Sequence, residues 1–451
     1  MSAGSLCPLS AWNASRVALN RRFLTSSSSV AHAPTIRRVT VGRRELLARA
    51  LPWVLGFAAV AGLVVVYAES IVGFFVDVVV YRSGGQAVLD HRALYDWLAA
   101  DVALPFTYPP FAALLFVPLA PLGATAAQLA WTTVSVAALT RSSWLIARAA
   151  SFGAWSLRQR FTIVVGTAAL MEPVYATFAF GQINLVIMWL VLEDFIGAVP
   201  ARWRGSLIGI ATGIKIVPGL FIIYLAVTRR LRDAGRAAAA FGATVLLGAI
   251  LGVSQSWSFW TGTAYDPQRT GPVAILSNQS TRGVLLRLRD GSLAWLDGST
   301  LISAQFLVSV MMVGVGLWTA RRWFLRGEQL LSVALVGLTS LLVSPISWSH
   351  HWIWLLPLVF GLLTAPRSRL LSAVAVAVIV VPTARVIWWV PHQFDRVYDY
   401  HGLTHVVADA YFIVGIFALV GCAIEARRVS RLNPPEAPAS RQPTAEFTPP
   451  S

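Results

Sequence analysis

Charged residues are scarce in this chain, and their scarcity limits what the protein can be. Only 12% of its 451 residues are charged and 56% are hydrophobic, whereas an ordinary soluble domain carries about 25% charged residues. Charge-free runs recur, each long enough to cross a bilayer as a helix of ~20 residues; they cover 111–140, 237–265, 298–320 and 329–366. The composition therefore excludes a string of soluble domains and predicts one polytopic, all-α membrane domain.

Cysteine, lysine and nucleotide-binding motifs are also scarce. The two cysteines, Cys7 and Cys422, lie far apart and lack metal-ligand spacing, so the sequence indicates neither a disulfide framework nor a zinc site. It contains no P-loop, GxGxxG or HExxH pattern. The net charge of +16 comes from arginine clusters between hydrophobic runs. That is the positive-inside pattern of membrane proteins, and it argues against nucleic acid as a partner.

The arginine clusters predict a topology of about ten crossings with both termini cytoplasmic. The expected crossings cover about 47–68, 161–178, 182–199, 237–254, 301–320, 329–345, 351–364, 370–391 and 406–426, and one more leads into the basic stretch 141–160. Two apolar segments are broken by proline or glycine and are expected to be re-entrant, 111–122 and 204–229. We expect a disordered basic cytoplasmic tail over 1–45, a transmembrane domain over 46–430, an extracytoplasmic loop over 255–300 and a disordered Pro-rich cytoplasmic tail over 431–451.

On this topology, the unusual polar residues gather at the extracytoplasmic face. Asp77 is the only charge in an apolar run at the membrane edge, where a lone acid is costly unless it functions or pairs, for example with Arg82. Amide side chains and one arginine offer donors and acceptors for hydroxyls and phosphates; they are Gln182, Asn184, Asn278, Gln279 and Arg282. Each could equally satisfy its own loop. A site on this face favours a membrane-anchored activated donor over a cytoplasmic nucleotide sugar.

Two further features are open to more than one interpretation. The pair His350-His351 could bind metal, shuttle protons or hold a phosphate, but adjacent side chains on a helix point apart, which disfavours a shared metal. Lys215, the only lysine, lies near the tip of the 204–229 hairpin. It needs an anion such as a lipid phosphate, or else carbonyl groups or a buried acid. Polar residues at 392–409, including Asp395 and Asp409, could shape an acceptor site or form a solvated loop.

Six stretches in the region from about 70 to 360 carry a family likeness. They are Phe75-Val-Asp77-Val-Val-Val-Tyr81, Leu104-Pro-Phe-Thr-Tyr108-Pro-Pro-Phe-Ala112, Gly181-Gln-Ile-Asn184, Gly213-Ile-Lys-Ile-Val-Pro218, Asn278-Gln-Ser280 with Arg282-Gly283, and Ser344-Pro-Ile-Ser-Trp-Ser-His-His-Trp352. In this order they resemble the polyprenol-phosphate-mannose-dependent α-(1→2)-mannosyltransferases of actinobacterial cell envelopes. Those enzymes belong to the GT-C class of multi-pass glycosyltransferases.

The resemblance implies a GT-C-like fold in the cell membrane and an inverting transfer of mannose from polyprenyl-phosphate-mannose. The acceptor would be a lipid-linked mannoside: a phosphatidylinositol mannoside, lipomannan or lipoarabinomannan. Asp77 falls on the position of the catalytic base, and His350, His351, Arg282 and Lys215 are candidates for the donor phosphate. Candidates for the sugar or acceptor are Tyr81, Tyr108, Gln182, Asn184, Asn278 and Gln279. We expect no cofactor and no metal. Lys215 is the discordant member, because its hairpin opens to the cytoplasmic side.

Other functions compete with this one. Related enzymes transfer arabinofuranose from decaprenyl-phosphoarabinose, so the class is more secure than the sugar. A transporter or flippase for a lipid-linked sugar would share the membrane domain, but would be expected to show internal repeats between its halves, and none is evident. A non-catalytic scaffold of envelope synthesis would tolerate loss of Asp77, whereas an enzyme would not.

Overall fold

The computed structural model describes residues 43–432 except 74, 292–296, 367 and 394–396. The chain divides into two units, Met1–Leu46 and Leu47–Ser451. Of the first unit, only the beginning of helix α1 is described. The tails expected at 1–45 and 431–451 therefore lie almost entirely outside the described residues, and their predicted disorder stays a prediction.

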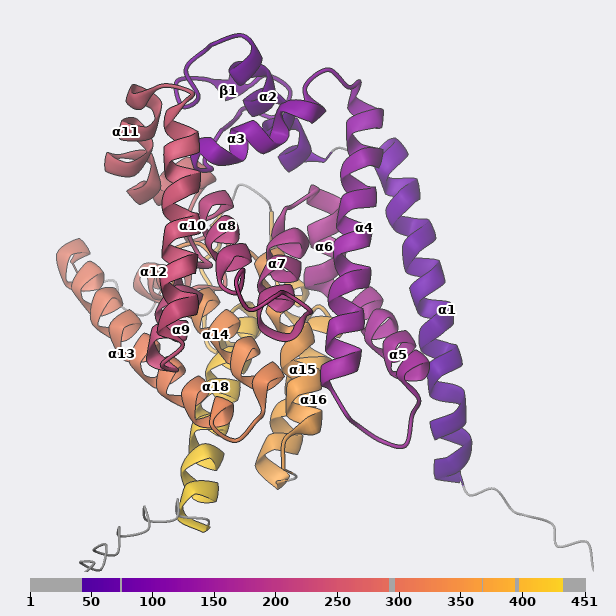
Figure 1. Cartoon of the computed structure of the whole chain (residues 1–451). Coiled ribbons are helices and arrows are strands. Elements are labelled where there is room, and N and C mark those ends of the chain that lie inside the picture. The colour runs from indigo at the N-terminus through magenta and orange to yellow at the C-terminus, as the bar shows by residue number, and fades with distance from the viewer. Residues whose placement is uncertain (1–42, 74, 292–296, 367, 394–396, 433–451) are drawn as a thin grey trace, which may run out of the picture. The chain divides into compact units, whose positions relative to one another are not determined.

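Helices make up most of the described chain (Figure 1). The first ten are α1 (Arg43–Val72), α2 (Val76–Leu89), α3 (Pro110–Phe116), α4 (Ala124–Ala149), α5 (Leu157–Leu170), α6 (Glu172–Phe180), α7 (Asn184–Ile196), α8 (Ser206–Ile214), α9 (Gly219–Val227) and α10 (Leu231–Ala249). There follow α11 (Val253–Thr261), α12 (Thr281–Gly291), α13 (Gly298–Phe324), α14 (Gln329–Val343), α15 (Leu355–Thr364), α16 (Arg369–Thr383), α17 (Leu403–Ala408) and α18 (Ala410–Leu432).

Short elements connect these helices. The 3-10 helices are η1 (Val117–Leu119), η2 (Thr263–Tyr265), η3 (Pro267–Thr270), η4 (Ser349–Trp354) and η5 (Val386–Trp389). The strands β1 (Leu98–Ala99) and β2 (Leu104–Pro105) pair antiparallel, with Leu98 opposite Pro105. The described residues are thus all-α apart from this one small ribbon, as the composition predicts.

The apolar helices include candidate membrane spans. Within the described residues, α1, α13 and α18 are long and apolar enough to cross a bilayer. Two bent pairs raise the number to five if each is one span: α3–η1 with α4, which turn by 115°, and α5 with α6, which turn by 68°. Helices α14 and α16 are apolar but shorter. Every segment expected to cross coincides with a helix or a helix pair, while the count of about ten crossings stays a prediction.

Glycines allow the apolar helices to approach closely. Helix α1 runs beside α4 and α5 (Figure 1). A Cβ at Gly166 of α5 would collide with the backbone of Leu55 in α1, and the Tyr67 and Thr133 hydroxyls join α1 to α4 at 3.2 Å. Packing between small residues is the usual way for helices to associate where water provides no hydrophobic drive.

The segment 204–229 is a helical hairpin. Helix α8 runs parallel to α10 at close range. The evidence is that a Cβ at Gly205 would meet the Asp233 carbonyl and that one at Gly213 would collide with Thr244. After the break at 215–218, α9 returns the chain toward the start of α10. The expected hairpin with Lys215 near its tip agrees with this geometry.

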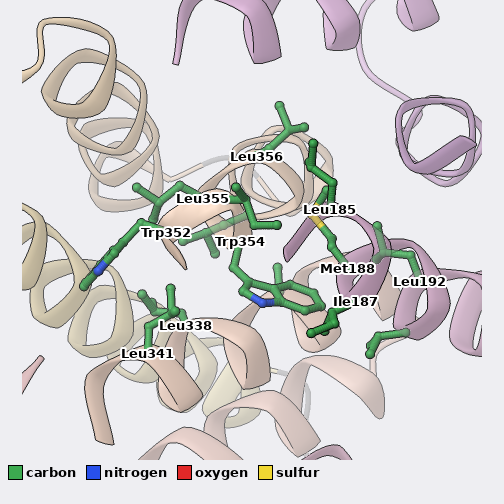
Figure 2. Packing of buried hydrophobic residues seen from close by; sticks show 14 of the residues in the cluster. Leu185, Ile187, Met188, Leu192, Leu338, Leu341, Trp352, Trp354, Leu355 and Leu356 are labelled. Atoms are coloured by element: carbon green, nitrogen blue, oxygen red, sulfur yellow. The ribbon is translucent and has the colours of Figure 1, made fainter. Parts of the chain in front are cut away.

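The histidine pair lies on η4, which is anchored in the apolar core. Trp352 is fully buried, and the Trp354 ring lies against Gly337 of α14, where a Cβ would collide with it. Figure 2 shows Trp354 among Leu338 and Leu341 of α14, Leu185 and Met188 of α7, and Leu355 of α15. The core thereby fixes the direction in which the two histidines leave the backbone.

The segment 255–300, expected as one long loop, contains most of α11, all of η2, η3 and α12, and the start of α13 in its described part. A buried ion pair holds it to the C-terminal helices: Arg287 Nε lies 2.8 Å from Asp409 Oδ1. The same guanidinium donates to the carbonyls of Ile275 and Asn278 at 2.9 and 3.0 Å. The segment is thus not irregular throughout, because it contains local helices and is held by this ion pair. Its placement outside the membrane stays a prediction.

Candidate active site

A cavity of about 690 Å³ gathers most of the predicted site residues. Its walls come from α2, the stretch before α3, the α6–α7 turn, the tip of the α8–α9 hairpin, residues 263–282 and η4. The predicted residues that line it are Asp77, Tyr108, Gln182, Lys215, Arg282, His350 and His351. Residues almost 300 positions apart in sequence therefore share one chamber, of a size typical of ligand sites.

Asp77 lies in the first turn of α2, where the helix dipole favours a negative charge. The neighbouring Phe75 and Val78 are buried against Gly181, whose φ of 71° and lack of a side chain let the α6–α7 turn approach α2. That approach brings Gln182 to the carboxylate. Burial raises the pKa of Asp77 to about 7, while the hydrogen bond from Gln182 and the charge of Lys215 oppose the rise. An acid with a pKa near 7 suits general-base work.

Two tyrosines support this acid in different ways. The Tyr108 hydroxyl donates to Gln182 Oε1 at 3.2 Å, which leaves the amide nitrogen of Gln182 for Asp77. The Tyr81 hydroxyl lies 3.0 Å from that of Tyr108 and accepts the Ile183 N–H at 3.2 Å. Tyr81 is fully buried and does not line the cavity. Tyr81 therefore supports Tyr108 and the α6–α7 turn through these two hydrogen bonds, and its predicted contact with sugar stays a prediction.

Lys215 reaches the cavity from the hairpin tip. Its Nζ lies 3.1 Å from Asn184 Oδ1 and 3.2 Å from His351 Nε2. Because an ammonium group only donates, Nε2 of His351 is the acceptor. Asn184 Nδ2 in turn donates to the carbonyl of His350 at 3.1 Å. The reservation about Lys215 was wrong in its geometry, because a hairpin that opens at one end of the domain still places its tip at the cavity.

His350 lines the cavity wall but is mostly buried. Only 7% of it is exposed, and its Nε2 is a buried atom without a hydrogen-bond partner among the described residues. Its ring packs against Phe180 at 5.1 Å and is nearly perpendicular to the His351 ring at 4.7 Å. The described part of the chain holds no group of three or more His, Cys, Asp or Glu side chains able to share a metal ion.

Asn278 and Gln279, predicted to bind sugar, have buried side chains that serve the fold. Both are fully buried, and neither lines the cavity. Asn278 Nδ2 donates to Val273 O at 2.8 Å and its Oδ1 accepts the Ser347 N–H at 2.9 Å. Gln279 Nε2 donates to Leu276 O and Ala408 O, both at 2.7 Å. The structure brings neither amide into the cavity with Asp77, and their predicted contact with sugar stays a prediction.

Sequence reasoning missed a buried acid behind the histidine pair. Glu172 begins α6 and is only 3% exposed. Its carboxylate accepts hydrogen bonds from Ser349 at 2.9 Å, Trp388 at 3.1 Å and Tyr411 at 2.9 Å. Ser349 and Trp388 line the cavity. The signal was present, since Glu172 is a lone charge in an apolar run, as Asp77 is.

The 392–409 stretch divides between two roles. Asp409 is buried beside Arg287 and also lies 3.1 Å from His405 Nδ1, so it is structural. Asp399 and His401 form an exposed pair at 3.2 Å. None of these side chains lines the cavity, and Asp395 lies outside the described residues.

Comparisons with known proteins identify the family of the chain. Residues 106–345, more than half of the chain, match Glycosyltransferase family 87. A polyprenol-phosphate-mannose-dependent alpha-(1-2)-phosphatidylinositol mannoside mannosyltransferase of Mycobacterium tuberculosis is 35% identical over 70% of this chain and 76% of its own length. Its counterpart in Mycolicibacterium smegmatis is 36% identical over 66% and 72%. A Mycobacterium tuberculosis enzyme named for phosphatidylinositol pentamannoside is 35% identical over 83% of both chains. No solved structure matches significantly. The chain therefore belongs to Glycosyltransferase family 87 and is a glycosyltransferase.

Proposed function

We propose that this glycosyltransferase moves mannose from polyprenyl-phosphate-mannose to the 2-hydroxyl of a lipid-linked mannoside, with inversion and with Asp77 as general base. The observation that carries the proposal is the grouping of one acid and several donors in one cavity. Asp77 lines the same chamber as Lys215, His350 and His351. Relatives whose names specify this donor and phosphatidylinositol mannoside acceptors share about 35% of their residues with the chain.

The proposed step needs a base on one side of the anomeric carbon and a cation on the other. Asp77 takes the proton of the acceptor 2-hydroxyl, whose oxygen forms a bond to C1 of mannose. The bond between C1 and the phosphate oxygen breaks, and its electron pair leaves on the lipid phosphate. Because attack and departure occur on opposite faces, a β-linked donor gives an α product.

The leaving phosphate gains negative charge as it departs, so fixed donors beside it lower the barrier. Lys215 carries a positive charge and is held in place by Asn184 and His351. His350 lines the same cavity and is a further candidate for contact with the phosphate. These groups are joined by direct contacts, and the charge of Lys215 acts on Asp77. A single mannose ring can therefore bridge the base and the phosphate-binding groups.

The proposed face of the membrane follows from the arginines. Arg204 and Arg229 stand at the open end of the α8–α9 hairpin, whereas Lys215 at its tip lines the cavity. Since arginine-rich loops face the cytoplasm, the cavity would open toward the extracytoplasmic side. A lipid-linked donor is available there and nucleotide sugars are not.

Transfer from labelled donors tests the proposal. Membranes containing the protein are supplied with polyprenyl-phosphomannose or decaprenyl-phosphoarabinose and a phosphatidylinositol mannoside, and membranes without the protein are the control. We expect mannose transfer alone, with a new α-(1→2) linkage in the product. Transfer of arabinofuranose alone would overturn the sugar and keep the enzyme class. Transfer from neither donor, by protein that is folded and inserted, would overturn the proposed function.

A further inference from the structure

The cationic side chains of the cavity come from two separate segments. Lys215, Arg269 and Arg282 line it, against the acids Asp77 and Asp266. Asp266 is exposed and its Oδ1 caps η3 by accepting the Gln268 N–H at 3.0 Å. Among the described residues, neither Arg269 nor Arg282 has an acid within ion-pair distance. Two uncompensated guanidinium groups on a cavity wall indicate a second anionic ligand group.

Lys215 lies near Asp77 and already has partners there. It contacts Asn184 and His351, and its charge acts on the Asp77 carboxylate. In the proposed reaction the donor phosphate is bonded to the anomeric carbon, and that carbon must lie beside the base. The single donor phosphate therefore belongs with Lys215 and the histidine pair.

Arg269 and Arg282 come from a different wall, the segment 263–282. Arg269 donates from one terminal nitrogen to the Tyr95 carbonyl at 2.8 Å, and its Nε has no partner among the described residues. Tyr95 packs on Phe259 at 5.7 Å and on Phe106 at 6.2 Å, which fixes the position of that carbonyl. Arg282 lies in the first turn of α12, the helix secured by Arg287. The backbone that carries each arginine is therefore fixed by its own contacts.

Resting on the proposed function, we propose that Arg269 and Arg282 form a second anion subsite that binds the phosphodiester of a phosphatidylinositol mannoside acceptor. Guanidinium groups bind phosphate oxygens through paired hydrogen bonds, which lysine does not match. The two substrates each bring one phosphate. Binding them at separate cations lets the donor phosphate leave while the acceptor stays anchored.

The test compares two acceptors that differ in phosphate. One is a phosphatidylinositol mannoside and the other is a phosphate-free alkyl α-mannoside. Wild type, Arg269→Gln and Arg282→Gln are assayed with a saturating labelled donor, and the ratio of kcat/KM for the two acceptors is measured. Since a charged hydrogen bond contributes strongly to binding, each substitution should lower this ratio roughly tenfold or more. Arg269→Lys keeps the positive charge but loses the paired N–H donors of the guanidinium. It should lower the ratio less than Arg269→Gln does.

Arg92→Gln is the matched control, because Arg92 is exposed, pairs with Asp90 and does not line the cavity. Its ratio should equal that of wild type. An unchanged ratio in both cavity variants would overturn the second subsite, and so would a rise in donor KM without a change in the ratio. The alkyl mannoside reaction also reports whether each variant is folded. If wild type transfers to neither acceptor, the proposed function fails, and not merely this inference.

Discussion

Replacing Lys215 by methionine should shift the pH dependence of transfer. In the proposed reaction Asp77 is the base. Burial raises the pKa of its carboxyl to about 7, and the positive charge of Lys215 opposes this rise. A base works only when it is ionised, so kcat/KM should fall as the pH drops below about 7. It should fall again above about 8, because burial lowers the pKa of Lys215 to that value and the phosphate-binding charge is then lost. Removing the ammonium group removes an interaction that favours the ionised carboxylate. The pKa of Asp77, and with it the acid limb, should therefore move upward in Lys215→Met.

The size of this shift follows from the contacts. An opposite charge close to an acid typically lowers its pKa by ~1–3 units. A shift of about one unit from the wild-type value would cost roughly eightfold in ionised base at pH ~6.5. The variant should also lose roughly ten- to a hundredfold wherever the wild-type Lys215 is protonated, because a charged hydrogen bond to the phosphate is gone. Burial lowers the pKa of Lys215 to about 8. Below that pH only the first loss varies with pH, so the two losses are separable there.

The assay measures kcat/KM for labelled donor in detergent or vesicles from pH 5.5 to 9. Lys215→Arg keeps the positive charge and should leave the limb near its wild-type position. His350→Gln should lower the maximum without moving the limb, which separates Asp77 from its imidazole neighbours. An acid limb at the same pH in Lys215→Met and wild type would refute the claim that Lys215 tunes the titrating base.

Three further substitutions test the supports of the site. Arg287→Met leaves Asp409 buried without its partner and should destabilise the protein by ~3–5 kcal/mol, seen as a lower unfolding midpoint in detergent; an unchanged midpoint would contradict the structural role of this pair. Gly213→Val drives a side chain into Thr244 and should displace the hairpin tip, so transfer should fall well below that of a Gly242→Val control with open space; equal activities would argue against this helix contact. Glu172→Gln replaces one of the two acceptor oxygens with an amide donor, so the three donors to this side chain keep only one oxygen; this should cost ~1–3 kcal/mol, measured by thermal unfolding, and full stability would show that the network tolerates a neutral acceptor.

Much of the fold could be predicted from the sequence. Charge-free runs locate the helices because burial in lipid permits little else, and prolines mark the break between α3 and α4. The 255–300 segment was harder, because its helices are short and depend on Arg287 for support. The number of membrane crossings does not follow from the sequence in the same way, since apolar helices such as α14 are shorter than a bilayer span.

Site residues could be predicted where a charged residue stands alone in an apolar stretch of sequence. Asp77 and Lys215 are isolated charges in apolar sequence, and both line the cavity. The burial of Asn278 could not be predicted, because sequence gives the donor and acceptor types but not the direction of the side chain. Arg269 was not predicted as a site residue, because it lies in a polar segment where an arginine is not unusual. The depth reached by the hairpin tip depends on packing between α8 and α10, which no local pattern encodes.

The central claim is that Asp77 removes the acceptor proton during transfer from a polyprenyl-phosphate-linked mannose. The direct test loads wild type and Asp77→Asn with labelled donor, verifies equal donor binding, and follows a single turnover after acceptor is added. Loss of a general base typically costs ~10²–10⁴-fold in rate, so the variant should bind donor normally and transfer at least a hundredfold more slowly. Transfer within a few-fold of wild type would mean that Asp77 is a structural acid and that the base lies elsewhere.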